Sequence, residues 1–364
     1  MDFEPSEEHR ELAALSARIL TDRVTNQRLR EIEGGAERFD PELWQELGKA
    51  DVLGAALPAP EGGGLGLVEQ CGVLVEIGRA VAPVPYLPSI TAGASVLAEF
   101  GGTDHRRRWV APAARGEVVL TAALAEPSAD PRAPITRAER AGSDWVLTGE
   151  KTNVPVIGVV DLLLVPAMTA RGPRVFPVEP RSPGLRISRQ EVVDSDSEGH
   201  LELTGVKVPE AEVLGAGALE ELLRRSAIGV CAHQVGVLSD ALRRTAEHAA
   251  ERVQFGRAIG SFQAVAQRLA DAFIDVQAAQ LTMWQAAWSA GEGLPCDTEV
   301  ATAKFWAAEA GHRVAHTAVH VHGGVGLDLD HELHRYFVAA KRNEFALGGA
   351  TTWLRRVGAR LAAK

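Results

Sequence analysis

Two stretches in the carboxyl-terminal part of the chain decide its interpretation: Arg252–Gln263, which reads RVQFGRAIGSFQ, and His320–Gly326, which reads HVHGGVG. In the first, a long helical pattern stops at an arginine, an aromatic residue and a glycine, and a second helical pattern begins near Ser261. We expect Gly256 at the C′ position that closes the first helix, because glycine readily adopts the left-handed conformation needed there. In the second stretch, the glycines allow the backbone to approach a phosphate closely.

Three side chains of the first stretch suit the binding of a phosphorylated, aromatic ligand. Arg252 offers a guanidinium for bidentate phosphate binding, Phe255 offers a flat ring for stacking, and Gln263 offers an amide for a polar edge. The alternative is structural: the stretch is a capped turn between two helices, and Phe255 fills the core. The residues of this stretch alone leave both interpretations open.

Outward from these stretches, helical patterns fill both ends of the chain and short β-rich runs fill its middle. A capping residue opens a helix at Ser6 and another at Asp40-Pro41. We expect an α+β protein with an N-terminal helical domain over 1–115, a middle antiparallel β-barrel domain over 116–215 and a C-terminal helical bundle domain over 216–364. The expected strands are Val118–Ala122, Trp145–Thr148, Val160–Val165, Val175–Val178, Leu185–Ile187 and Leu201–Leu203.

Composition excludes several classes of protein. The net charge of −10 argues against nucleic-acid binding, which needs a basic surface. No apolar run is long enough to span a membrane, so we expect no membrane insertion. The polar first residues, MDFEPSEEHR, do not resemble a secretory signal, and the three cysteines form no paired motif, so we expect a cytoplasmic protein with buried, reduced thiols.

Taken together, the ordered motifs resemble those of the acyl-CoA dehydrogenase family. The family's R-x-x-F-G, F-Q, Q-x-x-G-G and R-Y elements correspond to Arg252–Gly256, Phe262-Gln263, His320–Gly324 and Arg335-Tyr336. Its T-E-P and G-E-K motifs correspond to Ala125-Glu126-Pro127 and Gly149-Glu150-Lys151. The resemblance implies an N-terminal helical domain, a β-barrel domain, a C-terminal four-helix bundle, and FAD bound at a subunit interface.

The resemblance also implies which residues reach the FAD of a neighbouring subunit. Arg252 would bind near the pyrophosphate, and Phe255 and Gln263 would contact the adenosine half. Gly323 and Gly324 would let the backbone approach the cofactor. His320 takes the place of the usual glutamine.

The chain departs from the family at the catalytic position. The family carries a glutamate after the R-Y element that removes the substrate α-proton, and here Leu347 stands in its place. Leucine cannot accept a proton, so no catalytic residue is assigned to this chain. Ser226 occupies the position from which some members supply the base instead, and it is not acidic. Glu344, almost one helical turn before Leu347, is the alternative as a displaced base.

The contacts through which such a chain would hold its own flavin are also altered. Ala125 replaces a hydroxyl residue before Glu126-Pro127. The stretch Asn153-Val154-Pro155-Val156 stands where the family has an aromatic residue followed by I-T-N, and Pro155 has neither a hydroxyl nor an N–H to donate. The chain therefore resembles the β subunits of heterotetrameric (α2β2) acyl-CoA dehydrogenases of actinobacterial steroid degradation. That resemblance implies a homologous α subunit with the catalytic glutamate, a steroid acyl-CoA substrate held mainly by that subunit, FAD shared at the interface, and an electron-transfer flavoprotein as acceptor.

Two other hypotheses remain. One is an autonomous homo-oligomeric flavoenzyme that uses Glu344. The other is a metal-binding helix, because His312, His316 and His320 recur every four residues on one helical face.

Overall fold

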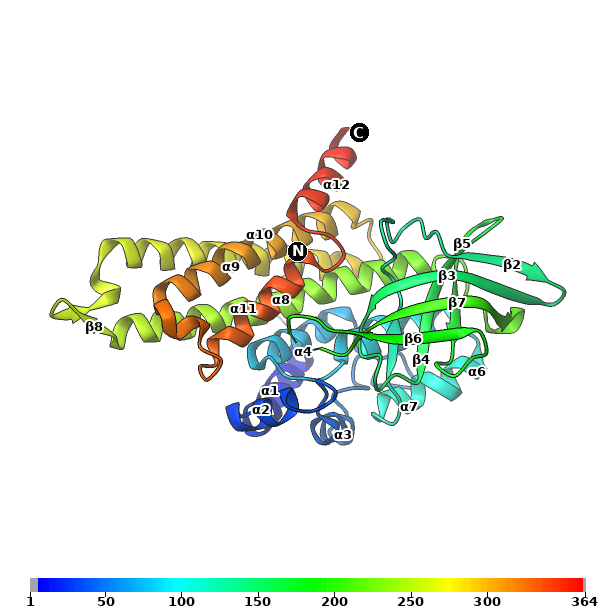
Figure 1. Ribbon diagram of the computed structural model, residues 1–364, viewed down its shortest axis with the longest axis horizontal. Coiled ribbons are helices and arrows are strands. Elements are labelled where there is room, and N and C mark those ends of the chain that lie inside the picture. Colours follow the sequence, from blue (N-terminus) through cyan, green and yellow to red (C-terminus); the bar gives the residue numbers. More distant parts are fainter. Residues whose placement is uncertain (1–5, 195, 363–364) are drawn as a thin grey trace. The chain divides into compact units, whose positions relative to one another are not determined.

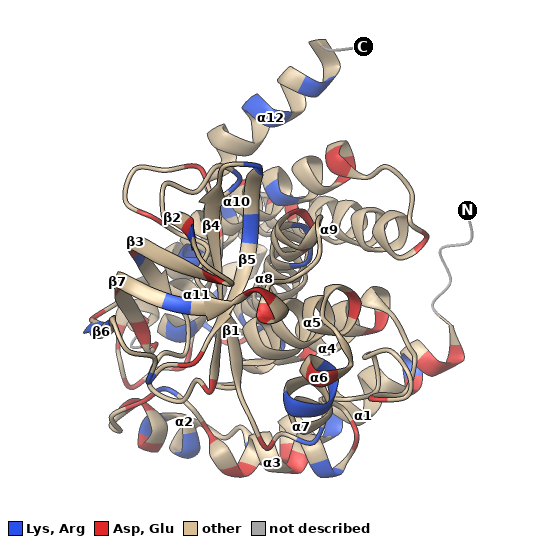
Figure 2. Ribbon diagram, turned by 90° about the vertical axis from the view of Figure 1, so that its right-hand side faces the viewer, with Lys and Arg blue, Asp and Glu red and all other residues tan. Residues whose placement is uncertain are grey.

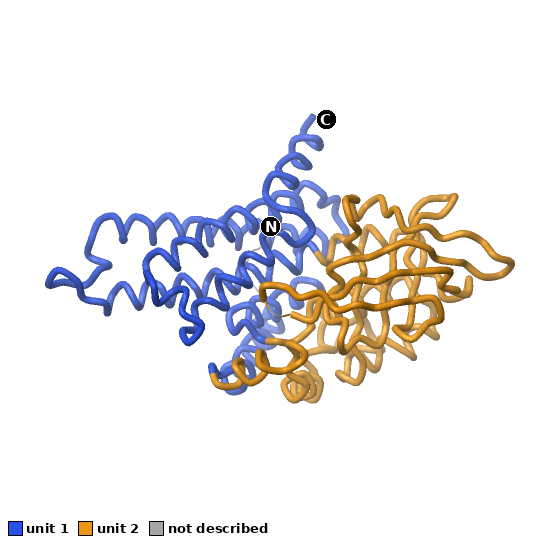
Figure 3. Tube along the Cα trace, in the orientation of Figure 1, with its two compact units in different colours: residues 1–26, 67–82, 227–364 blue, residues 27–66, 83–226 orange. Residues whose placement is uncertain are grey.

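A computed structural model describes residues 6–194 and 196–362, which divide into two compact units (Figure 3). Unit 1 comprises residues 1–26, 67–82 and 227–364, and unit 2 comprises residues 27–66 and 83–226. Lys and Arg alternate with Asp and Glu along many of the helices, whereas α12 carries arginines and no acid (Figure 2). None of the described helices is both long enough and apolar enough to cross a membrane.

Unit 1 is helical, and four long helices run alongside one another in it (Figure 1). They are α8 (Ala218–Glu251, in this unit from residue 227), α9 (Gln263–Gly291), α10 (Asp297–His322) and α11 (Leu333–Phe345). The unit also holds α1 (Glu7–Arg23), α4 (Leu67–Ala80) and α12 (Ala350–Ala362). The expected four-helix bundle is confirmed.

A buried glutamine ties three of these helices together. The Gln234 amide nitrogen, on α8, donates to the carbonyl of Ala307 on α10 at 3.2 Å and to that of Ala340 on α11 at 3.1 Å. Its oxygen accepts from Asn343 Nδ2 at 2.9 Å. A side chain at Gly311 would overlap the Gln234 amide nitrogen, so glycine is required on the facing turn of α10. The polar core of the bundle is therefore satisfied and fixes the register of its helices.

A second close approach joins α4 to α8. A Cβ at Gly78 would overlap the carbonyl oxygen of His233, and one at Gly236 would overlap that of Val75. The two backbones therefore touch where these helices cross.

A ring contact joins α9 to α1: Trp284 of α9 packs edge-on to His9 of α1, with ring centroids 5.2 Å apart.

The N-termini of α1 and α3 have the caps that the sequence predicts. Ser6 accepts from the backbone N–H of His9 at 3.0 Å. In unit 2, Asp40 accepts from the N–H groups of Glu42 and Leu43 at 3.1 Å each, and Pro41 is the first residue of α3 (Pro41–Lys49). The other helices of unit 2 are short: α2 (Asn26–Glu33, in this unit from residue 27), the π-helices η1 (Leu87–Ala94) and η2 (Arg106–Val110), α5 (Ser95–Phe100), α6 (Thr103–His105), α7 (Ala111–Ala114) and the 3-10 helix η3 (Glu210–Glu212).

A curled seven-stranded sheet forms the rest of unit 2. Its strands follow the order β1-β4-β2-β3-β7-β6, with β5 on β4: β1 (Leu120–Ala122), β2 (Arg137–Ala141), β3 (Asp144–Val154), β4 (Leu162–Thr169), β5 (Gly172–Val178), β6 (Leu185–Gln190) and β7 (Glu198–Pro209). Each expected strand overlaps an observed one, but β2 is not predicted. The sequence of β2, RAERA, shows no alternation of apolar and polar residues, because four of its five residues are exposed.

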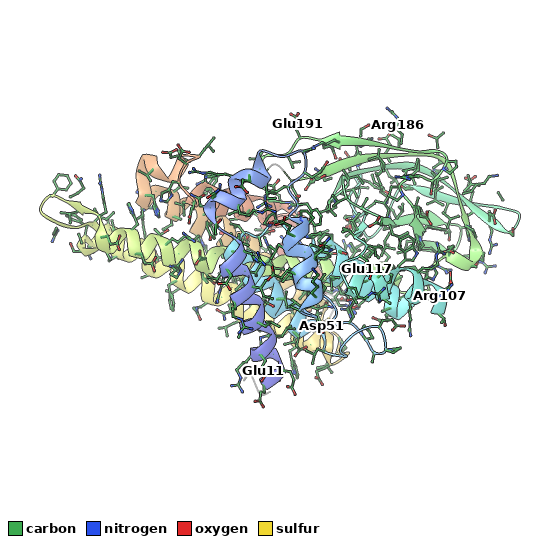
Figure 4. All side chains as sticks on the ribbon, turned by 90° about the horizontal axis from the view of Figure 1, so that it is seen from below. Glu11, Asp51, Arg107, Glu117, Arg186 and Glu191 are labelled. Carbon is green, nitrogen blue, oxygen red and sulfur yellow. The ribbon has the colours of Figure 1, made fainter. Side chains whose placement is uncertain are left out.

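The sheet is not wholly antiparallel, which corrects the expectation for this domain. Both β1 and β2 pair with β4 in parallel, whereas the other pairs are antiparallel. Parallel pairing needs a long connection between the strands, and residues 123–161 supply it between β1 and β4. At the other edge, the edge strand β6 carries Arg186, which pairs with Glu202 of the neighbouring strand β7, and Glu191 follows its last residue (Figure 4).

The T-E-P and G-E-K motifs meet as a buried ion pair. Lys151 Nζ lies 2.6 Å from Glu126 Oε1, and both side chains are almost fully buried. The same carboxylate accepts from the backbone N–H groups of Ile135 and Thr136. Burial lowers the pKa of Lys151 to about 8 against the opposing effect of Glu126.

The three cysteines are buried and free, as expected.

We predict that Lys151→Met destabilises unit 2 by about 3–5 kcal/mol, because it leaves the Glu126 carboxylate buried without its counter-charge. Thermal unfolding of the full chain measures the effect. The double variant Lys151→Met/Glu126→Gln should recover part of the loss, and a double variant no more stable than the single one would contradict the ion-pair assignment.

Candidate functional site

Arg252–Ala258 form a two-stranded hairpin between α8 and α9. The strands β8 (Val253–Gln254) and β9 (Arg257–Ala258) pair antiparallel, and Phe255 and Gly256 form the two-residue turn with φ of 52° and 78°. Positive φ at both turn residues is typical of a type I′ hairpin. The prediction that Gly256 closes α8 at C′ is therefore wrong: α8 ends at Glu251, and the glycine serves the hairpin turn instead.

The hairpin presents its ring to solvent rather than to the core. Phe255 is 92% exposed, which excludes the interpretation of this residue as a core plug. Its ring stands edge-on to Phe262, with centroids 6.2 Å apart, and the Arg257 guanidinium lies over the Phe262 ring at 4.1 Å. Arg252 is exposed at the base of the hairpin, and its carbonyl accepts from the N–H of Ile259 at 2.8 Å. The 3-10 helix η4 (Ile259–Ser261) leads into α9, whose first residue is the exposed Gln263.

The glycine turn lies at the end of α10. Gly323 has φ 66° and ends this helix, and the 3-10 helix η5 (Gly323–Leu327) follows. Gly324 and Gly323 are exposed, and among the described residues, apart from the immediate chain neighbours, no atom lies within 4 Å of a Cβ built on either glycine. Gly324 therefore has neither a left-handed φ nor a close neighbour in this chain to explain the missing side chain.

The ends of α8 and α10 are adjacent, so the two stretches singled out in the sequence meet. The ring of His248, one helical turn before Arg252, stacks on that of His322 with centroids 4.3 Å apart. His322 directly precedes Gly323. The structure thus brings Arg252, Phe255, Gln263 and the glycine turn to one end of the bundle (Figure 1), together with the exposed His320.

Leu347 lies in the turn between α11 and α12 and does not belong to this end cluster. It has φ 58°, and a buried lysine holds its turn in place. Lys304 Nζ, on α10, donates to the carbonyls of Asn343, Glu344 and Gly348 at 3.1, 3.3 and 3.3 Å. Trp353 Nε1 donates to the carbonyl of Leu347 at 3.2 Å. Burial lowers the pKa of Lys304 to about 8.

Comparisons with known proteins agree with this architecture. Residues 6–117 match the acyl-CoA dehydrogenase N-terminal domain, and residues 215–362 match the acyl-CoA dehydrogenase C-terminal domain. Acyl-CoA dehydrogenase FadE27 of Mycobacterium tuberculosis is 46% identical over 100% of this chain and 99% of its own length. The chain belongs to the acyl-CoA dehydrogenase family.

Two solved structures resemble this family member over nearly its whole length. A chain of the ChsE4-ChsE5 complex from Mycobacterium tuberculosis matches with a TM-score of 0.97 and 46% identity, covering 100% of both chains. The Tcur3481-Tcur3483 steroid ACAD G363A variant matches with a TM-score of 0.94 and 41% identity, covering 98% of this chain and 99% of that one. The first of these structures is a two-component complex, and the second is a variant of a steroid acyl-CoA dehydrogenase.

Two further sequence features, the R-Y element and the row of histidines on α10, do not form a binding site of their own. In the R-Y element, Arg335 donates to the Asn26 side chain at 2.7 Å, and the Tyr336 hydroxyl donates to the carbonyl of Arg79 at 2.8 Å, so this element fastens α11 within unit 1. Within the described residues, no group of three His, Cys, Asp or Glu is arranged to hold a metal, so the hypothesis of a His312, His316 and His320 metal site is wrong. The His312 and His316 rings do approach each other, with centroids 4.5 Å apart, but among the described residues no third ligand completes a site.

Two residues that shape these regions were not predicted from the sequence: Lys304, which holds the turn at Leu347, and His248, which lies one turn before Arg252. In the sequence, Lys304 looks like an ordinary polar residue of an alanine-rich helix. Its partners are backbone carbonyls about forty residues away, and no sequence motif indicates such a contact. His248 lies one turn before Arg252 and meets His322 only in the folded bundle. The only available hint of this contact was the pair of histidines in His320-Val321-His322, which marks the end of α10 as a place for ring contacts.

We predict that Lys304→Met costs at least about 2 kcal/mol of stability, because three carbonyls around the turn lose their donor. Hydrogen exchange should show the loss concentrated in residues 343–349. Lys49→Met, at an exposed lysine, is the control. Unchanged exchange across 343–349 would contradict the assigned role of Lys304.

Proposed function

We propose that this chain is the non-catalytic β subunit of a heteromeric, FAD-dependent acyl-CoA dehydrogenase and that it completes the FAD site of a partner α subunit. One observation supports the proposal: leucine stands at position 347, where the resemblance places the family's base, while the residues expected to contact FAD, such as Arg252 and Phe255, are exposed. Within the part of the chain that the structure describes, the Phe255 ring is left 92% exposed, and no residue outside the immediate chain neighbours closes around Gly324. A cofactor held by another chain accounts for both.

The residues at the end of the bundle fit the cofactor. Arg252 is exposed and can pair with the pyrophosphate, and Phe255 offers a free ring face to the adenosine half. Gln263 and His320 offer hydrogen-bonding groups, and the glycine turn at 323–324 leaves room for close approach. The flavin, when bound, accepts the hydride that leaves the substrate β-carbon. The part of this chain is to bind and orient the nucleotide half.

A partner chain must then supply the base that removes the α-proton. Support for such a partner comes from α9, which exposes Phe273, Ile274 and Leu281 on its outer face, at 56%, 63% and 62% exposure. Exposed large apolar side chains grouped in this way mark an interaction surface. An α2β2 assembly with a homologous α subunit is consistent with this surface, and an electron-transfer flavoprotein is the expected acceptor.

We further propose that the substrate is a steroid side-chain CoA thioester such as 3-oxocholest-4-en-26-oyl-CoA, bound mainly by the partner and desaturated between the α and β carbons during sterol β-oxidation. The support is the similarity to the ChsE4-ChsE5 complex and to a protein described as a steroid acyl-CoA dehydrogenase.

The alternative, an autonomous enzyme with Glu344 as a displaced base, is disfavoured by the surroundings of that carboxylate. Lys341 Nζ lies 2.6 Å from Glu344 Oε2, and His312 Nδ1 lies 3.3 Å from Oε1. The side chain is almost buried, and both oxygens are engaged within this chain. A base must instead present a free oxygen to the substrate.

We predict that Arg252→Ala weakens FAD binding by the co-expressed complex about tenfold to a hundredfold, because a charge-assisted phosphate contact is lost. The measurement is the FAD-to-protein ratio after gel filtration. Arg18→Ala, at an exposed arginine of α1, is the matched control. Equal FAD content in the Arg252 variant and the control would contradict binding across the interface.

We predict that Glu344→Gln leaves the turnover of the complex essentially unchanged, since glutamine still accepts a hydrogen bond from Lys341. Loss of a true general base would lower turnover about a hundredfold or more. Steady-state dehydrogenation of the steroid CoA thioester distinguishes the two outcomes, and a loss of that size would revive the displaced-base hypothesis.

A further inference from the structure

Three imidazoles from three segments meet where the two halves of the proposed site join. His248 belongs to the last turn of α8, His322 is the last residue of α10, and His331 lies just before α11. The rings of His248 and His322 are stacked at 4.3 Å with 21° between their planes, and the His331 ring lies 5.4 Å from that of His322. No motif of the family assignment uses this cluster.

The hydrogen bonds fix how the central ring is protonated. His322 Nδ1 lies 2.9 Å from the carbonyl oxygen of Ala318, which can only accept, so Nδ1 carries the proton and Nε2 has none in the neutral ring. His331 Nδ1 accepts from the N–H of Leu333 at 3.2 Å, so its own proton is on Nε2. These hydrogen bonds therefore fix the tautomer that His322 and His331 adopt when each ring is neutral.

The charges around the cluster disfavour protonation of the stack. Burial, followed by Arg252 and His331, lowers the pKa of His248, and only Glu251 opposes this. Burial lowers the pKa of His322, as do His248 and His331, against the Ala318 carbonyl. From the α11 side, Glu332 is already paired with Arg244. The η5 segment, GGVGL, contributes no titratable group.

The sign of the pH effect follows from these shifts. A histidine with a lowered pKa in the closed arrangement takes up its proton more readily once the arrangement opens. The closed arrangement is therefore fully favoured above the ordinary histidine pKa of about 6.5 and loses stability as the pH falls below it.

We propose that His322 is a positioning residue. Its uncharged ring, stacked on His248, fixes the end of α10, which leads into the Gly323–Gly324 turn, relative to the end of α8, which leads into the Arg252 hairpin. Protonation of the stack separates these two halves of the site. The inference rests on the proposed function only where it predicts cofactor release. His322 is one residue from the glycine turn, and His248 is one helical turn from Arg252. Displacement of either ring therefore moves a proposed FAD contact.

The test compares the wild-type chain with His322→Phe at about pH 7.5 and about pH 5.5. Phenylalanine keeps an aromatic ring against His248 but takes up no proton. Hydrogen-exchange protection of residues 252–258 and 323–327 in the full chain without cofactor should fall several-fold at the lower pH in the wild type and stay constant in the variant. His200→Phe, at a histidine of β7, is the control and should behave as the wild type does.

FAD retention by the co-expressed complex is the second readout. Wild type should lose FAD several-fold more readily at the lower pH, and His322→Phe should not. Exchange that depends on pH in a complex that never binds FAD would support the positioning role and contradict the proposed function. Exchange that is independent of pH, or equally dependent on pH in wild type and variant, overturns the positioning role.

His248→Phe repeats the test from the other ring, in case His322→Phe fails to fold. It should remove the pH dependence in the same way, and a His248→Phe chain with wild-type pH dependence also overturns the inference.

Discussion

The amide of Gln234 is the contact on which the arrangement of unit 1 depends. It bonds α8 to the backbones of α10 and α11, and it fits only because residue 311 is glycine. A buried amide with several partners fixes helix register more strictly than apolar contacts do, because a shift would leave polar atoms unpaired. With that register set, the end of α8 meets the end of α10.

The same framework holds the turn that carries Leu347. Lys304 holds the residues around Leu347 by their carbonyls, so the turn keeps its shape although its side chain cannot accept a proton. At the far end of the bundle, Phe255 and the glycine turn remain displayed outward. Under the proposed function, these two features are what a division of labour between two homologous chains requires.

Local signals in the sequence predicted the parts of this structure that local forces determine. The Ser6 and Asp40 caps, the long helices and most strands follow from residues close in the chain. The Phe255-Gly256 turn was not predicted correctly, because a glycine after a helix suits both a C′ cap and a hairpin turn. Parallel pairing of β1 with β4 and the stacking of His248 on His322 join distant residues, and a single sequence carries no record of them.

The central claim is that this chain completes an FAD site rather than containing one. The most direct measurement is the FAD-to-protein ratio of the chain purified alone and purified with its co-expressed α partner. The account predicts little flavin alone and one FAD per pair of chains in the complex. One FAD per chain in the absence of any partner would contradict it.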